Sequence, residues 1–70
     1  MSDNEYSQLV LDLINESEDT LYFMFRNSVR QIKFTSPYDN EYQYIVKRHS
    51  AICEAFKTKT GHGIMEDVDD

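Results

Sequence analysis

Residues 20–35, with the sequence TLYFMFRNSVRQIKFT, decide the fold that we predict for this chain of 70 residues. Aromatic and β-branched residues, which fit strands well, fill both halves of the segment. Asn27-Ser28 separates the halves and suits a two-residue hairpin turn, although less well than Asn-Gly does, so a longer loop is also compatible. We therefore predict a β-hairpin with the strands Thr20–Arg26 and Val29–Thr35.

The register of this hairpin follows from a two-residue turn, which pairs Phe25 with Arg30 and Phe23 with Ile32. Successive side chains of a strand point to opposite faces, so the register decides which residues share a face. One face then carries Leu21, Phe23, Phe25, Ile32 and Phe34. The other face carries Tyr22, Met24, Arg26, Val29, Gln31 and Lys33.

The segment before the hairpin has the pattern of an amphipathic helix. Ser2 and Glu5 stand at the spacing of a capping box, in which each side chain satisfies a backbone amide of the other. Apolar residues then recur at helical spacing, at Tyr6, Leu9, Val10, Leu13 and Ile14. The polar run 15–20 is expected to end this helix.

The segment after the hairpin predicts a long helix over Pro37–Thr60, which Gly61 ends. Ser36 is expected to be its N-cap, Pro37 its first residue and Asp39 its capping-box partner. Apolar and aromatic residues follow in alternating steps of four and three and form a seam, at Tyr38, Tyr42, Ile45, His49, Ile52 and Phe56. We thus predict an α+β fold of the order αββα in residues 1–60, followed by a flexible acidic tail over residues 61–70.

A domain of this size has a small core, and a two-stranded sheet leaves two open edges. Both helices pack on the apolar hairpin face in one arrangement, and a second copy of the chain covers the remaining apolar surface in the other. We favour a homodimer because the apolar residues exceed what one small core hides. The interface candidates are the hairpin edges, the face with Tyr22, Met24 and Val29, and the seam with Tyr42, His49 and Phe56.

Cys53 is the only cysteine, which excludes a disulfide within the chain and fits a reducing compartment. The longest apolar run, 21–25, is much shorter than the roughly 20 residues that span a bilayer. We therefore expect a cytoplasmic protein without a membrane partner.

His49 and Cys53 are four residues apart and have the spacing of two metal ligands on one helix. Two ligands do not form a site, and His62 in the tail is a poor third. A histidine beside a small buried thiol is the favoured interpretation, because free cysteine usually behaves as a small hydrophobic residue. The same pair has no residue that visibly orients the histidine as a catalytic dyad requires. We expect no metal, no cofactor and no enzymatic activity.

Charge is distributed unevenly along a chain whose net charge is −6. All seven basic residues lie in residues 20–60, whereas residues 1–19 hold six acids and residues 61–70 hold four. These ten acids are Asp3, Glu5, Asp12, Glu16, Glu18, Asp19, Glu66, Asp67, Asp69 and Asp70. An acidic surface favours basic partners and also keeps small proteins in solution. In the functional interpretation, the stripe of Glu5, Asp12 and Glu16 imitates phosphates and occupies a basic groove of another protein.

Two alternatives use other residues. A regulatory adaptor would bind its partner through aromatic and apolar side chains, since tyrosine is frequent at interface hot spots. Its candidate residues are Tyr22, Met24, Tyr42, Tyr44, His49 and Phe56. Direct nucleic-acid binding would use Arg30, Lys33, Lys47 and Arg48, but no helix-turn-helix, zinc-finger or aromatic RNP pattern accompanies them and the net charge opposes it.

In its length, its acidic start with Glu5, Asp12 and Glu16, and its acidic end Glu66–Asp70, the chain resembles small acidic proteins that phages make early to disable host proteins. Some of those proteins mimic DNA electrostatically. The resemblance implies a viral inhibitor that occupies the surface of a basic, nucleic-acid-binding host protein. The seven basic residues depart from the pattern of a pure DNA mimic.

Overall fold

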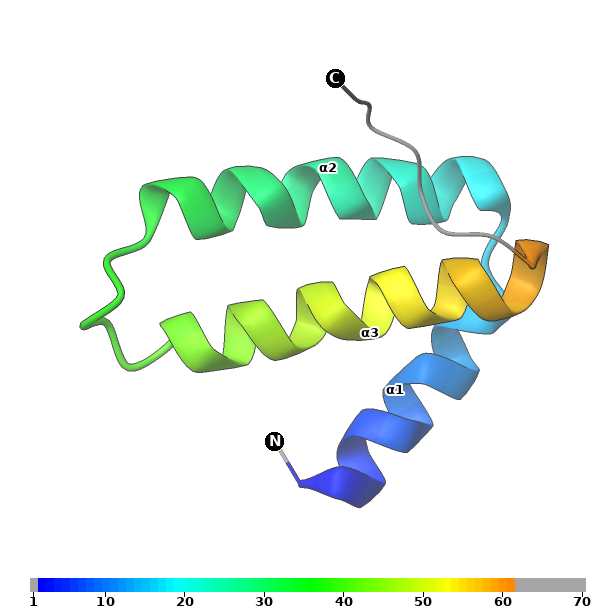
Figure 1. Ribbon diagram of the computed structural model, residues 1–70, viewed down its shortest axis with the longest axis horizontal. Coiled ribbons are helices and arrows are strands. Elements are labelled where there is room, and N and C mark those ends of the chain that lie inside the picture. Colours follow the sequence, from blue (N-terminus) through cyan, green and yellow to red (C-terminus); the bar gives the residue numbers. More distant parts are fainter. Residues whose placement is uncertain (1, 62–70) are drawn as a thin grey trace.

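The computed structural model describes residues 2–61, and in this range it consists of three α-helices without any strand (Figure 1). The helices are α1 (Asp3–Ile14), α2 (Glu18–Phe34) and α3 (Tyr42–Thr60). The predicted α+β fold is therefore wrong. The described part of the chain is all-α, and the segment expected to form a hairpin is the single helix α2.

α2 begins inside the polar run that we expected only to end the first helix. Ser17 is its N-cap, and the Ser17 hydroxyl accepts a hydrogen bond of 3.1 Å from the backbone amide of Thr20. Glu18 and Asp19 follow in the first turn, where negative charge interacts favourably with the helix dipole. A helix start is thus encoded three residues before the presumed first strand.

Helical periodicity explains why this segment forms a helix and not the predicted hairpin. Leu21, Phe25 and Ser28 are separated by steps of four and three and are buried together. The hairpin register instead placed Phe23 beside Leu21 and Phe25, yet Phe23 is 66% exposed. Residues 21–25 are apolar or aromatic at every position, so they place apolar side chains on the buried side of either a strand or a helix. Such a short run does not distinguish the two structures.

The prediction for the first helix is confirmed, including its capping box. The Ser2 hydroxyl accepts from the Glu5 amide at 3.2 Å, and the Glu5 carboxylate accepts from the Ser2 amide at 2.8 Å. Val10 and Leu13 are buried on the predicted apolar face. The other members of that face, Tyr6, Leu9 and Ile14, pack around the core.

The predicted third helix is confirmed in its end but wrong in its start. α3 begins at Tyr42, because residues 35–41 form turns that use the expected capping groups locally. The Ser36 hydroxyl accepts from the Tyr38 amide at 3.2 Å, and the Asp39 carboxylate accepts from the Glu41 amide at 2.8 Å. Gly61 ends α3 in the left-handed conformation at φ 85°, as its lack of a Cβ permits.

The three helices form a flat molecule of about 34 × 34 × 16 Å. α2 and α3 run antiparallel, and α1 crosses α3 on the side away from α2 (Figure 1). α3 therefore packs on both other helices, while α1 and α2 hardly contact each other. Three of its residues, Ala51, Ile52 and Ala55, are completely buried between the two partners.

The all-α fold changes the expected assembly of the protein. Within residues 2–61 no strand exists, so the predicted pairing of hairpin edges between two copies is wrong. The homodimer itself stays a prediction, because several large apolar side chains are exposed. In the same range of residues, no helix combines the length and the apolar character needed to cross a membrane.

Candidate functional site

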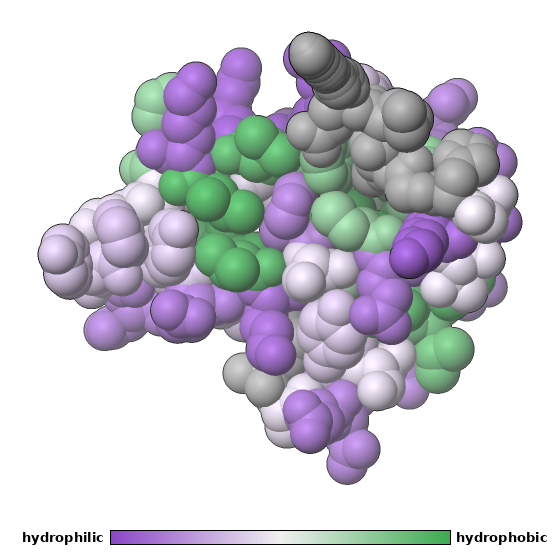
Figure 2. Space-filling view, in the orientation of Figure 1, coloured by the Kyte–Doolittle hydropathy of each residue, from purple (hydrophilic) through white to green (hydrophobic). Residues whose placement is uncertain are grey.

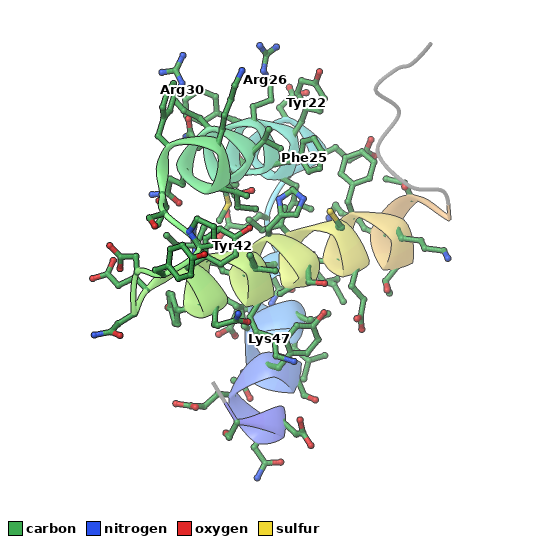
Figure 3. All side chains as sticks on the ribbon, turned by 60° about the vertical axis from the view of Figure 1, so that its left-hand side comes forward. Tyr22, Phe25, Arg26, Arg30, Tyr42 and Lys47 are labelled. Carbon is green, nitrogen blue, oxygen red and sulfur yellow. The ribbon has the colours of Figure 1, made fainter. Side chains whose placement is uncertain are left out.

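The side of α2 that faces away from α3 combines aromatic and basic residues. We call it the α2 outer face, and its members are Tyr22, Phe23, Arg26, Arg30, Lys33 and Phe34. Phe23 and Phe34 are 66% and 79% exposed, and Tyr22 is 43% exposed. In Figure 3, Tyr22, Arg26 and Arg30 point away from α3, whereas Phe25 on the same helix points toward it.

Helix geometry arranges four of these residues in one row. Tyr22, Arg26, Arg30 and Phe34 follow one another at intervals of four, which places successive side chains next to each other along the surface. An aromatic ring thus stands at each end of the row and two guanidinium groups stand between them. The buried residues of α2 are Leu21, Phe25 and Ser28, which face α3. Their packing determines which side of α2 points outward.

The basic groups of the outer face are not used inside the described structure. None of the side-chain hydrogen bonds found within residues 2–61 involves Arg26, Arg30 or Lys33. Arginine presents a planar fork of donors that matches a carboxylate with two hydrogen bonds. The row is therefore suited to bind carboxylates that lie beside apolar side chains.

Apolar surface is not confined to α2. The space-filling view in Figure 2 shows apolar side chains gathered along the boundary between α2 and α3, with hydrophilic side chains around them. Tyr38 in the loop before α3 is 94% exposed, Tyr44 on α3 is 55% exposed and Leu11 on α1 is 59% exposed. The outer face differs from these single residues because it combines several aromatic rings and basic groups on one helix.

Several of the predicted acidic residues have local structural roles. Asp3, Glu5, Asp12, Glu16, Glu18 and Asp19 are all exposed. The pKa of Glu5 is lowered because its carboxylate accepts the hydrogen bond from the Ser2 backbone amide. Asp12 accepts from the Gln8 side chain at 3.0 Å, and Glu18 and Asp19 stand in the first turn of α2. The acids from Glu66 to Asp70 lie outside the described residues.

The predicted nucleic-acid-binding residues are not brought together. Arg30 and Lys33 belong to the α2 outer face, whereas Lys47 lies beside α1, as Figure 3 shows. The Lys47 ammonium is 5.4 Å from the centre of the Tyr6 ring, which is a cation–π contact between α3 and α1. Arg48 is half-buried. No single surface therefore presents all four basic groups.

Other charged residues of α3 also hold α1 in place. The Tyr6 hydroxyl donates to Glu54 at 3.1 Å, and the Lys59 ammonium donates to the Ile14 carbonyl at the end of α1 at 3.0 Å. A positive charge at this end is favourable, and α1 has no basic residue of its own in its last turn. Burial raises the pKa of Tyr6, and its hydrogen bond to Glu54 acts in the same direction.

His49 and Cys53 belong to a row of polar groups between α2 and α3. His49 Nε2 is 3.7 Å from the Cys53 sulfur, and Nδ1 is 2.7 Å from the Ser28 hydroxyl. Ser28 donates its proton to the Phe25 carbonyl at 2.8 Å, so its oxygen is the acceptor for a proton on Nδ1. The residue that orients His49 is thus Ser28, which we had assigned to a turn. Among the described residues, no group of three or more His, Cys, Asp or Glu is placed to hold a metal.

The predicted apolar interface is divided by the structure. Phe56 is buried in the core, and the His49 ring packs against the Phe25 ring at a tilt of 34°, with 5.0 Å between ring centres. Tyr42 and Met24 are half-buried, whereas Tyr22 and Tyr44 are exposed. Sequence reasoning missed Phe23 and Phe34 because the hairpin register put both on the buried face. The Ser17 cap is the signal that was available. A helix that begins there puts Phe23 and Phe34 off the stripe of Leu21, Phe25 and Ser28, and so outside the core.

Comparison of the chain with protein-family models, with curated proteins and with solved structures finds no match, so the proposals below are based on the geometry of the chain itself.

Proposed function

We propose that this chain is a protein-binding domain whose α2 outer face holds a partner segment that is both acidic and apolar. The observation that carries the proposal is the exposed row of Tyr22, Arg26, Arg30 and Phe34 on one helix. Aromatic residues and arginine are enriched at protein interfaces and dominate their hot spots. The proposal develops the adaptor hypothesis, with a surface centred on α2.

Preorganisation supports this surface. Leu21 and Phe25 anchor α2 on α3, so the backbone that carries the row is rigid before any partner arrives. A rigid helix loses little conformational entropy on binding, and only the outer side chains have to be ordered. The guanidinium groups supply specificity for carboxylates, and the rings at both ends supply apolar area.

The distribution of charge favours a protein over a nucleic acid as partner. Only three basic residues lie on the outer face, and the net charge of the chain is −6. Phosphate binding depends on many cationic contacts and is weakened by nearby negative charge. A short acidic peptide segment needs only the two arginines and Lys33.

An acidic inhibitor that mimics DNA is the second candidate function, and the exposed positions of Asp3, Asp12 and Glu16 favour it. Its binding surface would lie on α1 and on the connection to α2. Asp12→Asn with Glu16→Gln tests this surface better than Glu5→Gln does, because Glu5 also holds the capping box. A basic partner would lose affinity in this double variant and at high salt.

The proposed function is tested by selecting peptides from a random display library on the immobilised full chain. We expect enriched peptides that combine Asp or Glu with Leu, Ile, Met or Phe. Their affinity should fall by about tenfold in Arg26→Gln/Arg30→Gln, which corresponds to about 1.4 kcal/mol. The matched control is Asn4→Asp/Gln43→Glu, which lowers the net charge by the same amount at exposed positions on α1 and α3, and it should change affinity by less than about twofold.

Other results of the selection contradict the proposal. Acidic peptides that bind the Arg26→Gln/Arg30→Gln variant as tightly as the original chain would remove the outer face as the binding site. Enrichment of basic peptides that depend on Asp12 and Glu16 would favour the acidic inhibitor instead. A mobility shift of DNA or RNA that depends on Arg26 and Arg30 would replace the protein partner by a nucleic acid.

A further inference from the structure

We propose that the chain carries its own ligand for the α2 outer face, namely residues 62–70 with the sequence HGIMEDVDD. This inference rests on the proposed function, because it assigns the same face an intramolecular occupant that an outside partner must displace. The segment has the chemistry that the face requires. Ile64, Met65 and Val68 are apolar, and four acids alternate with or adjoin them, at Glu66, Asp67, Asp69 and Asp70.

The described chain ends at the same end of the molecule as the Tyr22 end of the row. α2 and α3 run antiparallel, so Gly61 at the end of α3 lies at the same end of the molecule as the start of α2 (Figure 1). Lys59, two residues earlier, contacts the Ile14 carbonyl just before α2 begins. Gly61, from which residues 62–70 continue, therefore lies at the end of α2 that carries Tyr22.

The length of the segment suffices to reach the basic part of the row. An extended chain advances at most about 3.3–3.6 Å per residue, so nine residues span about 30 Å. The row from Tyr22 to Phe34 is about 18 Å long, because a helix rises about 1.5 Å per residue. Part of the segment's length is needed to pass from the end of α3 around α2, because the outer face points away from α3. Nearly extended, the segment then follows the row from Tyr22 toward Arg30.

The charges of the two segments match in their order as well as in their sign. α2 begins with Glu18 and Asp19 and becomes basic only at Arg26, Arg30 and Lys33. Residues 62–65 contain no acid and would pass the acidic start of α2. Glu66 is five residues beyond Gly61, which is about 17 Å of extended chain, so the acids at 66–70 come within reach of Arg26 and Arg30 once the chain has passed around α2.

The expected consequence is regulation by competition. A tethered ligand has an effective concentration in the millimolar range, so even a weak contact occupies the face for much of the time. An outside acidic segment then binds only by displacing residues 62–70. Exposed ion pairs are individually weak and are screened by salt, so this contact is reversible and its strength falls as salt rises.

The test compares the full chain with its tail variant Glu66→Gln/Asp67→Asn/Asp69→Asn/Asp70→Asn by nuclear magnetic resonance. We expect the tail variant to shift the guanidinium Nε–H signals of Arg26 and Arg30. The control Asp3→Asn/Asp12→Asn/Glu16→Gln/Glu41→Gln raises the net charge equally and should leave both signals in place. The synthetic peptide HGIMEDVDD, added in trans, should bind the tail variant roughly threefold to tenfold more tightly than the original chain.

The outcomes separate this proposal from the proposed function. Equal peptide affinity for both chains, with unchanged Arg26 and Arg30 signals, overturns the intramolecular contact. If acidic library peptides still bind through Arg26 and Arg30 in that case, the proposed function stands alone. If the tail variant moves both signals but no library peptide binds, the intramolecular contact of residues 62–70 is supported and the proposed binding of an outside partner is contradicted. Shifts that grow with protein concentration would show that the tail docks on a second copy, which overturns the intramolecular form.

Discussion

Ser28 is the buried polar residue that joins α2 to α3 at the scale of single side chains. The residue is 1% exposed, and its hydroxyl donates to the Phe25 carbonyl and lies 2.7 Å from His49 Nδ1. Hydrogen bonds at buried polar groups restrict the geometry of a core, because an unsatisfied group there is costly. Ser28 and His49 therefore fix how α2 is rotated relative to α3, and so which side of α2 faces outward.

Ser28→Ala should lower the free energy of unfolding by about 1–2 kcal/mol, because His49 loses its hydrogen-bond partner on α2. Urea denaturation followed by circular dichroism measures the change. Gln31→Ala, at an exposed position one turn further along the same helix, is the control and should stay within about 0.5 kcal/mol of the original chain. If Ser28→Ala costs no more than Gln31→Ala, the contact between Ser28 and His49 does not stabilise the fold.

The roles of some single residues can be predicted from the local sequence, and those of others cannot. The capping box of Ser2 and Glu5 and the end of α3 at Gly61 were predicted correctly, because caps act over three or four residues and need no tertiary contact. Ser28 looked like a turn residue because its partner His49 is 21 positions away. Nothing in the local sequence shows that a serine will be buried against a histidine.

At the scale of the element, α2 is the segment where local preference and packing disagree. Its aromatic and β-branched residues favour a strand, but Leu21, Phe25 and Ser28 form a helical stripe that fits α3. A two-stranded hairpin alone is barely stable, whereas a helix of 17 residues satisfies its own backbone and buries one side. Tertiary packing decides the outcome, and sequence reasoning on the isolated segment had no access to it.

Asn27 distinguishes the two structures of this segment experimentally. Asn favours the turn of a hairpin, so Asn27→Ala would destabilise one, but Ala favours a helix interior over Asn by roughly 0.5 kcal/mol. In the structure Asn27 is an exposed residue in the middle of α2. Asn27→Ala should therefore raise the free energy of unfolding by about 0.5 kcal/mol, while Asn27→Gly should lower it by a few tenths. A loss of stability in Asn27→Ala, measured by urea denaturation, would contradict a helical α2.

At the scale of the whole molecule, the candidate site was only partly predictable. The sequence shows that basic residues lie in the middle of the chain and that acids lie at both ends. It does not show that Arg30 and Lys33 share a face with Phe23 and Phe34, while Lys47 lies at α1. That separation follows from the position of α3 between the other two helices, which only the assembled fold defines.

The central position of α3 predicts how the molecule opens. α1 packs on α3 through Val10 and Leu13 and hardly touches α2, so α1 can detach while the α2–α3 pair stays intact. Such a local opening exposes less apolar surface than global unfolding and has a smaller free energy. Amide hydrogen exchange should therefore be faster in α1 than at Ala51, Ile52 and Ala55 in the middle of α3.

Two mild core substitutions test whether this opening is independent, because each destabilises a different interface by about 1 kcal/mol. Leu13→Val weakens the α1–α3 contact, which is lost in both the local and the global opening, so it should speed exchange in α1 and in α3. Phe25→Leu weakens the α2–α3 contact, which the detached state still keeps. It should speed exchange in α3 by about fivefold, the factor that 1 kcal/mol corresponds to, and leave α1 unchanged. Equal acceleration of α1 by Phe25→Leu would mean that the three helices unfold as one unit.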